Sequence, residues 1–258
     1  MHREPLRYLH EFALDLAWRA GKTTLAHFQS ATSVEYKHDA SPVTIADRNA
    51  ERLLRQRIEE FFPQDGIVGE EFGETRPDAP RRWILDPIDG TRTFIHGVPL
   101  YGTLIGIEEN GQPLVGVIHM PALSETVSAV MGEGCWWNGR RARVSPTALL
   151  AEALVLTTDA EAMERYHPGV WNRVSSAVQK CRTWGDCYGY ALVATGRAEA
   201  MFDARMAVWD AAAVLPVIHE AGGIATDLRG RVTHTGGDLM ATNAALADPI
   251  RQLVSGDQ

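Results

Sequence analysis

The stretch Trp83–Thr91, which reads Trp-Ile-Leu-Asp-Pro-Ile-Asp-Gly-Thr, decides how this chain folds. Its apolar start predicts a buried strand that ends at Asp86, because the residue before a proline is disfavoured in the helical region. Gly90 and Thr91 then predict a turn into a helix. Asp86 and Asp89 would meet the free N–H groups of that helix at one corner. Carboxylates bind hard cations such as Mg²⁺ and a helix start binds phosphate, so the corner predicts a metal-assisted phosphate site. Ordinary turn chemistry is the alternative, since Asp-Pro and Asp-Gly are common turn dipeptides.

The composition narrows the class of protein. A chain of 258 residues can form one large α/β domain or two fused layers, and 45% hydrophobic with 22% charged residues is typical of soluble globular proteins. The formal net charge of −8 argues against a nucleic-acid partner and for a small-molecule substrate. The sequence has no run of about 18 apolar residues, so we expect no membrane span.

The cysteines and the N-terminus predict the cellular setting. Cys135, Cys181 and Cys187 form no Cys-x-x-Cys pair, and residues 1–5 lead directly into an amphipathic pattern instead of a signal peptide. We therefore expect a reduced, cytoplasmic protein without a zinc site.

The N-terminal part reads as helices followed by an antiparallel sheet. Apolar residues at helical spacing predict a first helix over residues 5 to about 28 and a second from about Ala46 to Phe61. Strands are expected over residues 66–69, 101–107, 114–119, 125–131 and 141–144. Residues 72–82 are expected to form a loop. Two Asn-Gly pairs, at 110–111 and 138–139, predict tight hairpin turns between antiparallel neighbours.

From about residue 149 strands and helices alternate. We expect strands at 154–157, 201–202 and 223–226, and helices near 160–180 and 187–195. The pattern predicts residues 1–148 as an α+β half that carries metal-binding motifs. Residues 149–258 would form an α/β half with its own smaller sheet, and this half would complete the site. No linker separates the two, so we expect one fused unit.

Three further acids lie at the ends of predicted elements. Asp47 falls in the first turn of the second helix, where helix capping is the simpler explanation, and Glu70 follows a short strand, where a solvated loop is the simpler one. Asp210 opens an apolar helix that should run to Glu220 and end at Gly222. A carboxylate there is costly unless it is paired, capped or metal-bound.

Together these motifs resemble the signatures of the inositol monophosphatase family, over essentially the whole chain. The resemblance rests on Gly69-Glu70-Glu71, on residues 86–91, and on Trp209-Asp210 with Glu220-Ala221-Gly222-Gly223. Residues 89–97 and 184–189 resemble more closely the branch that hydrolyses histidinol phosphate. The resemblance implies a layered αβαβα sandwich of the inositol monophosphatase and fructose-1,6-bisphosphatase type. It also implies a homodimer that uses Mg²⁺ to hydrolyse phosphate monoesters.

The resemblance further implies residue roles. The oxygen ligands of two Mg²⁺ ions would come from Glu70, Asp86, the carbonyl of Ile88, Asp89 and Asp210. A third, weaker Mg²⁺ near Glu70 is also a family feature. Thr91 with Asp47 would orient and deprotonate the attacking water, and the N–H groups of Gly90 and Thr91 would hold the phosphate. The chemistry agrees, because so many carboxylates in one cleft stay ionised only beside cations.

Two other functions share parts of this pattern. The haloacid dehalogenase class also places an aspartate before Asp-Gly-Thr, but its two aspartates are two residues apart with the first as nucleophile, whereas Asp86 and Asp89 are three apart. A phosphate-sensing module on the same fold is the non-enzyme alternative. The intact set of acids argues against it.

Substrate contacts are predicted at Asp186, Asp203 and Arg92. In the family, the position seven before the last metal aspartate faces the organic part of the substrate, and here that position is Asp203. Asp186 falls in another substrate-facing segment. Two acids beyond the metal set favour a cationic substrate such as L-histidinol phosphate over inositol phosphate or a broad range of sugar phosphates. The alternative explanation is a pair of solvated loop acids, one of them paired with Arg92.

Overall fold

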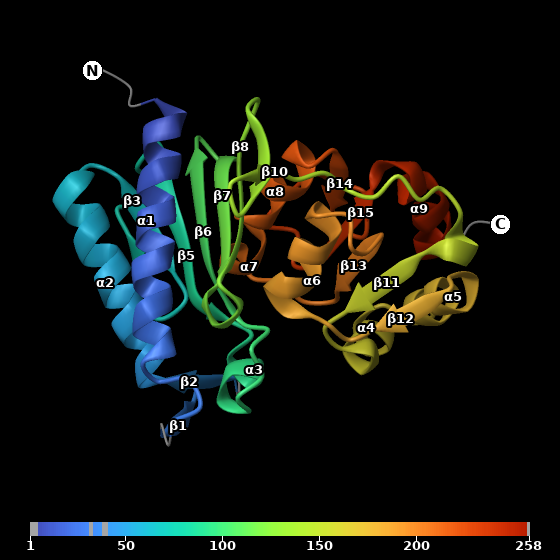
Figure 1. Cartoon of the computed structure of the whole chain (residues 1–258), viewed down its shortest axis with the longest axis horizontal. Helices are drawn as coiled ribbons and strands as arrows, with labels where there is room; N and C mark the ends of the chain where they lie inside the picture. Colours follow the sequence, from blue (N-terminus) through green and yellow to red (C-terminus); the bar gives the residue numbers. More distant parts are fainter. Residues whose placement is uncertain (1–4, 31–32, 38–40, 257–258) are drawn as a thin grey trace.

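The computed structural model describes residues 5–30, 33–37 and 41–256. Residues 1–4 lie outside this range. They belong to the N-terminal segment that is not expected to be a signal peptide. The described chain stacks as helices, sheet, helices, sheet and helices, which confirms the expected αβαβα sandwich (Figure 1). Its α-helices are α1 (Leu6–Leu25), α2 (Ile45–Phe61), α3 (Thr91–Ile95), α4 (Ala160–Tyr166), α5 (Val170–Ala177), α6 (Asp186–Ala194), α7 (Val208–Ala211), α8 (Val214–Glu220) and α9 (Ala247–Ser255).

The first sheet has the strand order β10-β9-β8-β7-β6-β5-β3-β4. Its strands are β3 (Gly66–Gly69), β4 (Gly73–Thr75), β5 (Arg81–Asp89), β6 (Gly102–Glu109), β7 (Gln112–Met120), β8 (Glu125–Val130), β9 (Gly134–Trp137) and β10 (Arg140–Arg141). All neighbours are antiparallel except β3 and β5. Asn110-Gly111 and Asn138-Gly139 form the predicted turns, each with positive φ at both residues.

Two predictions about this sheet are wrong. The segment 72–82 is not all loop, because it holds β4 and the start of β5. β4 is a short, largely exposed edge strand that shows no apolar alternation. The strand expected at 141–144 ends at Arg141, because the chain then turns to α8, where the N–H of Val144 donates to the carbonyl of Ala221 at 3.0 Å.

The second sheet has the order β12-β11-β13-β15-β14, which confirms a smaller sheet in the C-terminal part. Its strands are β11 (Leu154–Thr157), β12 (Lys180–Arg182), β13 (Ala200–Asp203), β14 (Gly223–Thr226) and β15 (Leu239–Asn243). The sequence did not predict β12, β15 or α9. It also did not predict the two-stranded sheet of β1 (Val34–Tyr36) and β2 (Pro42–Thr44). The division at residues 148/149 stays a prediction.

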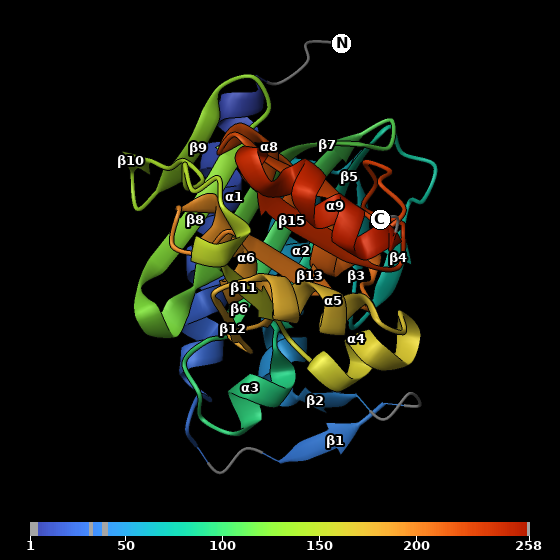
Figure 2. The same ribbon diagram turned by 90° about the vertical axis from the view of Figure 1, so that its right-hand side faces the viewer.

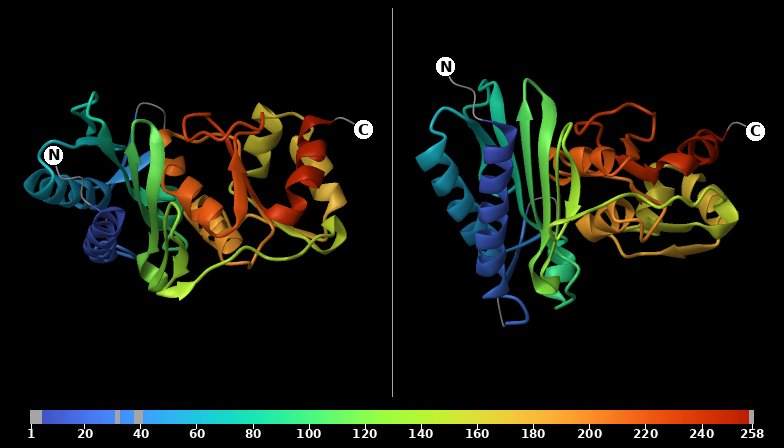
Figure 3. Two further views of the ribbon diagram at one scale, coloured as in Figure 1. Left: turned by 90° about the horizontal axis from the view of Figure 1, so that it is seen from above. Right: turned by 45° about the horizontal axis from the view of Figure 1, so that its top comes forward.

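The three largest hydrophobic cores in the described chain hold the layers together. On the outer face of the first sheet, α1 and α2 bury Leu9, Leu16 and Leu54 against Trp83 (Figure 3). A second core lies between the two sheets around α6 and α8, and it includes residues of both sheets. The third lies where α4, α5 and α9 cover the second sheet (Figure 2). No helix in the described ranges is both long enough and apolar enough to cross a membrane.

The central strand continues past its predicted end. β5 runs to Asp89, and the pairing with β6 shifts between Asp86 and Asp89. Pro87 lies in this irregularity, where its missing N–H interrupts no regular pairing. The distortion therefore absorbs the proline instead of ending the strand, and it keeps both aspartates on one strand.

The helix that carries Asp210 is interrupted. α7 ends at Ala211 and α8 begins at Val214, whereas one helix was predicted. Pro216 explains the break, because it has no N–H for the carbonyl of residue 212 and its ring clashes there in a regular helix. The small residues after Asp210 let this segment pack closely on the sheet, since a Cβ built on Gly116 of β7 would lie 2.1 Å from the carbonyl oxygen of Ala213.

Candidate active site

Three carboxylates from two elements meet between the layers. Asp86 and Asp89 come from the end of β5 and Asp210 from α7, and one oxygen of each lies within 4.8 Å of the others. Asp86 is only 2% exposed. Among the described residues, no lysine, arginine or histidine forms an ion pair with any of the three. Such a site leaves negative charge without an internal counter-ion.

Backbone N–H groups orient these carboxylates. Asp86 Oδ1 accepts from the N–H of Ile88 at 3.0 Å, and Asp210 Oδ2 accepts from the N–H of Ala207 at 2.7 Å, as a helix cap. Asp89 Oδ2 accepts from the N–H of Cys187 in α6. In each acid, one carboxylate oxygen thus accepts a backbone N–H. For Asp210 this hydrogen bond is a helix cap, one of the three possibilities that its sequence position raised.

The electrostatics of the cluster favour a bound cation. Burial, followed by the charges of neighbouring acids, raises the pKa of Asp86 and Asp89 well above the usual range. Burial likewise raises the pKa of Asp210 to about 7. A divalent cation would oppose all three shifts because it favours the ionised carboxylates, and an all-oxygen donor set is the one Mg²⁺ prefers. The residues present therefore fit Mg²⁺.

Glu70 has a partner that the sequence did not predict. Lys37, which follows β1, places its Nζ 2.8 Å from Glu70 Oε1 and 2.6 Å from Glu71 Oε1. Burial disfavours the charged lysine, but its hydrogen bonds and charge interactions with the two glutamates outweigh that and raise the pKa of Lys37. Nothing in the sequence around Lys37 indicates this contact, because it joins segments 33 residues apart.

A second unpredicted residue, Glu51, holds the turn after Glu70. This fully buried side chain accepts the N–H groups of Glu71 at 2.8 Å and Phe72 at 3.2 Å, and it pairs with Arg55 at 2.7 Å. A sequence signal for it exists. Glu51 lies three residues before Leu54, on the apolar face of the predicted helix, where an acid needs a buried partner.

Asp47 caps the helix α2 and also lies beside Thr91. Its Oδ2 accepts the N–H of Thr44 at 2.8 Å and the Thr44 hydroxyl at 2.6 Å, which completes a capping box at the start of α2. Its Oδ1 lies 3.5 Å from the hydroxyl of Thr91, which also donates to the carbonyl of Ile88 at 3.1 Å. Burial raises the pKa of Asp47. The structure thus brings Asp47, Thr91 and Ile88 together.

Gly90 lies between Asp89, an acid predicted to bind metal, and Asp186, an acid predicted to contact the substrate. It has φ +83°, and a Cβ built on it would lie 2.7 Å from Asp186 Oδ2. Both facts require glycine between β5 and α3. Asp186, the first residue of α6, itself has φ +50°, which is unusual for a residue with a side chain.

Asp186 and Asp203 face one small cavity. Its volume is about 90 Å³, and the acids Asp89 and Asp210 also line it. Burial raises the pKa of Asp203 to about 7 and also raises that of Asp186. Arg92 does not pair with them. It is exposed in the first turn of α3, and the structure gives its side chain no ion pair with a described residue. The explanation of Asp186 and Asp203 as solvated loop acids is therefore wrong.

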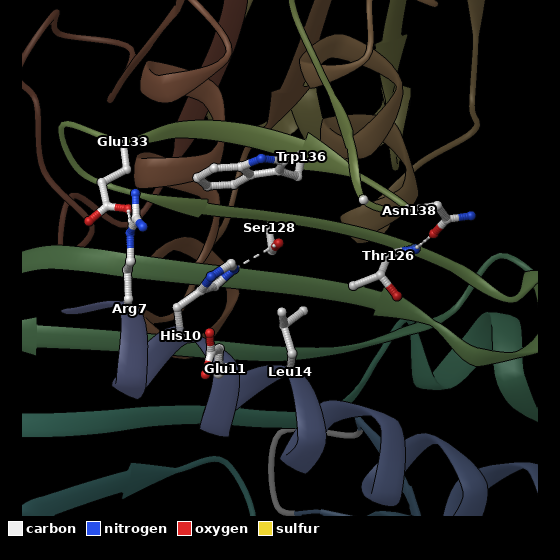
Figure 4. Close-up of a pocket in the computed structure, with 10 residues that line it drawn as sticks. Arg7, His10, Glu11, Leu14, Thr126, Ser128, Glu133, Trp136 and Asn138 are labelled. Atoms are coloured by element: carbon white, nitrogen blue, oxygen red, sulfur yellow. Dashed lines mark hydrogen bonds and ion pairs between the residues drawn. The ribbon is translucent and has the colours of Figure 1, made fainter. Parts of the chain in front are cut away.

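A larger cavity lies elsewhere. It has a volume of about 450 Å³ and lies between α1 and strands β8 and β9, as Figure 4 shows. His10 from α1 points into it and meets the Ser128 hydroxyl at 2.9 Å beside Trp136. It shares no residue with the acidic cluster, so the predicted chemistry does not belong there.

Comparison with known proteins adds to this geometry. The family model described as the inositol monophosphatase family matches residues 6–255. Histidinol-phosphatase of Chlorobaculum parvum is 47% identical over 241 residues, with 92% of each chain covered. Histidinol-phosphatase of Mycobacterium tuberculosis is 38% identical and covers 92% of this chain and 94% of its own.

A solved structure agrees in fold. An inositol monophosphatase from Zymomonas mobilis superposes with a TM-score of 0.89 at 33% identity, covering 98% of this chain and 100% of its own. The family match and the layered fold thus extend along nearly the whole described chain. This protein belongs to the inositol monophosphatase family.

Proposed function

We propose that this phosphoric monoester hydrolase acts on L-histidinol phosphate, releasing L-histidinol and inorganic phosphate. The observation that carries the proposal is the cavity in which Asp186 and Asp203 lie beside the metal acids without a cationic partner in the described chain. A substrate ammonium or imidazolium would supply that charge. The two relatives named histidinol-phosphatase support the same substrate.

We assign the Mg²⁺ ligands as the family resemblance implies. Asp86, Asp89 and Asp210 would hold one ion, and Glu70, Asp86 and the Ile88 carbonyl another, with two or three ions per subunit. Lys37 contacts Oε1 of Glu70, so Glu70 would bind the ion through Oε2 or through a shared Oε1. When bound, Mg²⁺ lowers the pKa of water and neutralises charge on phosphoryl oxygens.

The side chains around the acids would orient and deprotonate the attacking water. Thr91 would accept a hydrogen bond from the water while its own hydroxyl proton moves toward Asp47 Oδ1, for which Asp47 is suitably placed. The N–H groups of Gly90 and Thr91 would contact the phosphate oxygens. No protein nucleophile is required.

The substrate is tested by comparing kcat/KM for L-histidinol phosphate and inositol 1-phosphate at equal Mg²⁺. We expect L-histidinol phosphate to be preferred by about 10²-fold, because a buried charge left without its partner costs about 2–5 kcal/mol. Asp186→Asn and Asp203→Asn should shrink the ratio. A wild-type ratio near one, or one that favours inositol phosphate, would assign the chain to the inositol monophosphatase or broad-specificity alternative.

Thr91→Ala should lower kcat by about 10²–10⁴-fold, the usual contribution of a proton-transfer group, and leave Mg²⁺ affinity nearly unchanged. The reason is that Thr91 would act on the water while the carboxylates bind the metal. Steady-state kinetics and Mg²⁺ titration of the same sample measure both quantities. Normal turnover, or loss of Mg²⁺ affinity instead of turnover, would contradict the role given to Thr91 and Asp47.

Phosphate release from any monoester in the presence of Mg²⁺ also separates an enzyme from a phosphate-sensing module. A cytoplasmic location and a homodimer stay predictions. Cys135, Cys181 and Cys187 are all free thiols, as expected for a reducing compartment.

A further inference from the structure

Tyr190 lies next to Asp203, one of the predicted substrate acids, and no role was predicted for it from the sequence. It is in α6, four residues after Asp186, so both side chains lie on the same face of the helix. That face is turned toward the 90 Å³ cavity, which Tyr190 also lines. The ring is 1% exposed, so its hydroxyl needs a partner inside the protein.

The partner of that hydroxyl is Asp203. Tyr190 Oη donates to Asp203 Oδ2 at 2.9 Å, and the N–H of Thr158 approaches Asp203 Oδ1 at 3.4 Å. A carboxylate accepts about four hydrogen bonds, so each oxygen keeps capacity for a donor in the cavity. The two protein donors restrict rotation of a carboxylate that ends strand β13.

Thr158 links this acid to the other one. Its hydroxyl accepts the N–H of Asp186 at 2.8 Å, while the Thr93 hydroxyl donates to Asp186 Oδ2 at 3.0 Å. Both acids are therefore fixed by uncharged groups, which supply no positive charge to either carboxyl. The cation that also lines the cavity, Arg205, is directed to Tyr166, with its Nη1 3.3 Å from the Tyr166 hydroxyl.

We infer that Tyr190 is a specificity-determining positioning residue: by holding Asp203 it makes the cavity select phosphate monoesters whose organic part is cationic. The inference rests on the proposed function. Tyr190 does not touch the reacting phosphate and acts through Asp203. A neutral polyol can only donate hydrogen bonds to a fixed carboxylate, whereas a cation also gains charge attraction, so the position of Asp203 bears on the choice between substrates.

The test compares Tyr190→Phe with wild type on L-histidinol phosphate and inositol 1-phosphate. The ratio of the two kcat/KM values should fall about tenfold in the variant, because a hydrogen bond to a charged group is lost. Tyr188→Phe is the matched control. Tyr188 lies on the same helix but packs against Arg197 and does not line the cavity, so its ratio should equal that of wild type.

A double variant decides whether Tyr190 acts through Asp203. If it does, Tyr190→Phe combined with Asp203→Asn should have the same ratio as Asp203→Asn alone. A purely structural effect would lower both kcat/KM values together and leave the ratio unchanged, which would overturn the inference. Additive effects in the double variant would overturn it as well. A wild-type ratio near one would overturn the proposed substrate and the inference with it, whereas a wild-type preference that Tyr190→Phe retains would overturn the inference alone.

Discussion

Asp86→Asn should lower kcat by at least about 10³-fold, which corresponds to about 4 kcal/mol of activation barrier. Asp86 is surrounded by the other acids. Burial is the largest cause of its raised pKa, and the charges of Glu70, Asp89 and Asp210 raise that pKa further. It is also the acid proposed to contact both Mg²⁺ ions. An amide keeps the shape of the side chain but loses the negative charge that attracts the cations.

The same variant should remain folded. In metal-free buffer it should unfold at a higher temperature than wild type, because one member of a repelling cluster has been neutralised. Steady-state kinetics and thermal unfolding measure the two effects. Asp248→Asn in α9 is the control for a carboxylate-to-amide change, since its side chain is 86% exposed and far from the cluster in sequence. Retention of more than about a tenth of the wild-type kcat, a difference of only about 1.4 kcal/mol, would refute the role of Asp86.

Removal of divalent metal should abolish phosphatase activity, and addition of Mg²⁺ should restore it. Within the described ranges, no cationic side chain pairs with Asp86, Asp89 or Asp210 to take the place of the ion. The measurement is phosphate release after treatment with a chelator and again after readdition of Mg²⁺. Full activity of a metal-stripped sample would refute the proposed metal site.

The metal-free protein should also show a specific pH dependence. For Asp210 the pKa rises from 3.8 to about 7 in the folded chain, so the folded state binds more protons than the unfolded state between these values. The free energy of unfolding of the metal-free protein, measured in chelator, should therefore fall as the pH rises from about 4 to 7. Saturating Mg²⁺ should reverse this trend, because it binds the ionised carboxylates. Identical unfolding profiles with and without Mg²⁺ would show that the acids do not form the metal site.

Local sequence patterns were sufficient for most elements. The Asn-Gly pairs placed both hairpin turns, because a tight turn with two positive φ angles is a local requirement. Helical spacing of apolar residues found α1 and α2 to within three residues. Of the missed elements, α9 does carry such a pattern, with Ala247, Ile250 and Val254 at helical spacing, but the missed strands β4 and β12 do not. β4 is polar and exposed at a sheet edge, and β12 is three residues long.

Whether Pro87 and Pro216 interrupt their elements depends on the hydrogen bonding around each proline. The sequence predicted a strand end at the first and overlooked the second. Pairing with β6 on both sides of Pro87 carried β5 on to Asp89. Inside a helix no such tolerance exists, because the N–H that Pro216 lacks is part of the repeating hydrogen-bond pattern.

The sequence by itself determined which acids lie at element ends and that Gly90 follows two of them, and it predicts that these acids bind a cation. These features depend on residue type and on neighbours a few positions away. Only the tertiary structure decided the partners of the acids. Lys37 reaches Glu70, and Tyr190 reaches Asp203, through contacts that the layered packing creates between separate elements. A hydrogen bond depends on where two side chains end in space, and a pattern read along one segment does not contain that information.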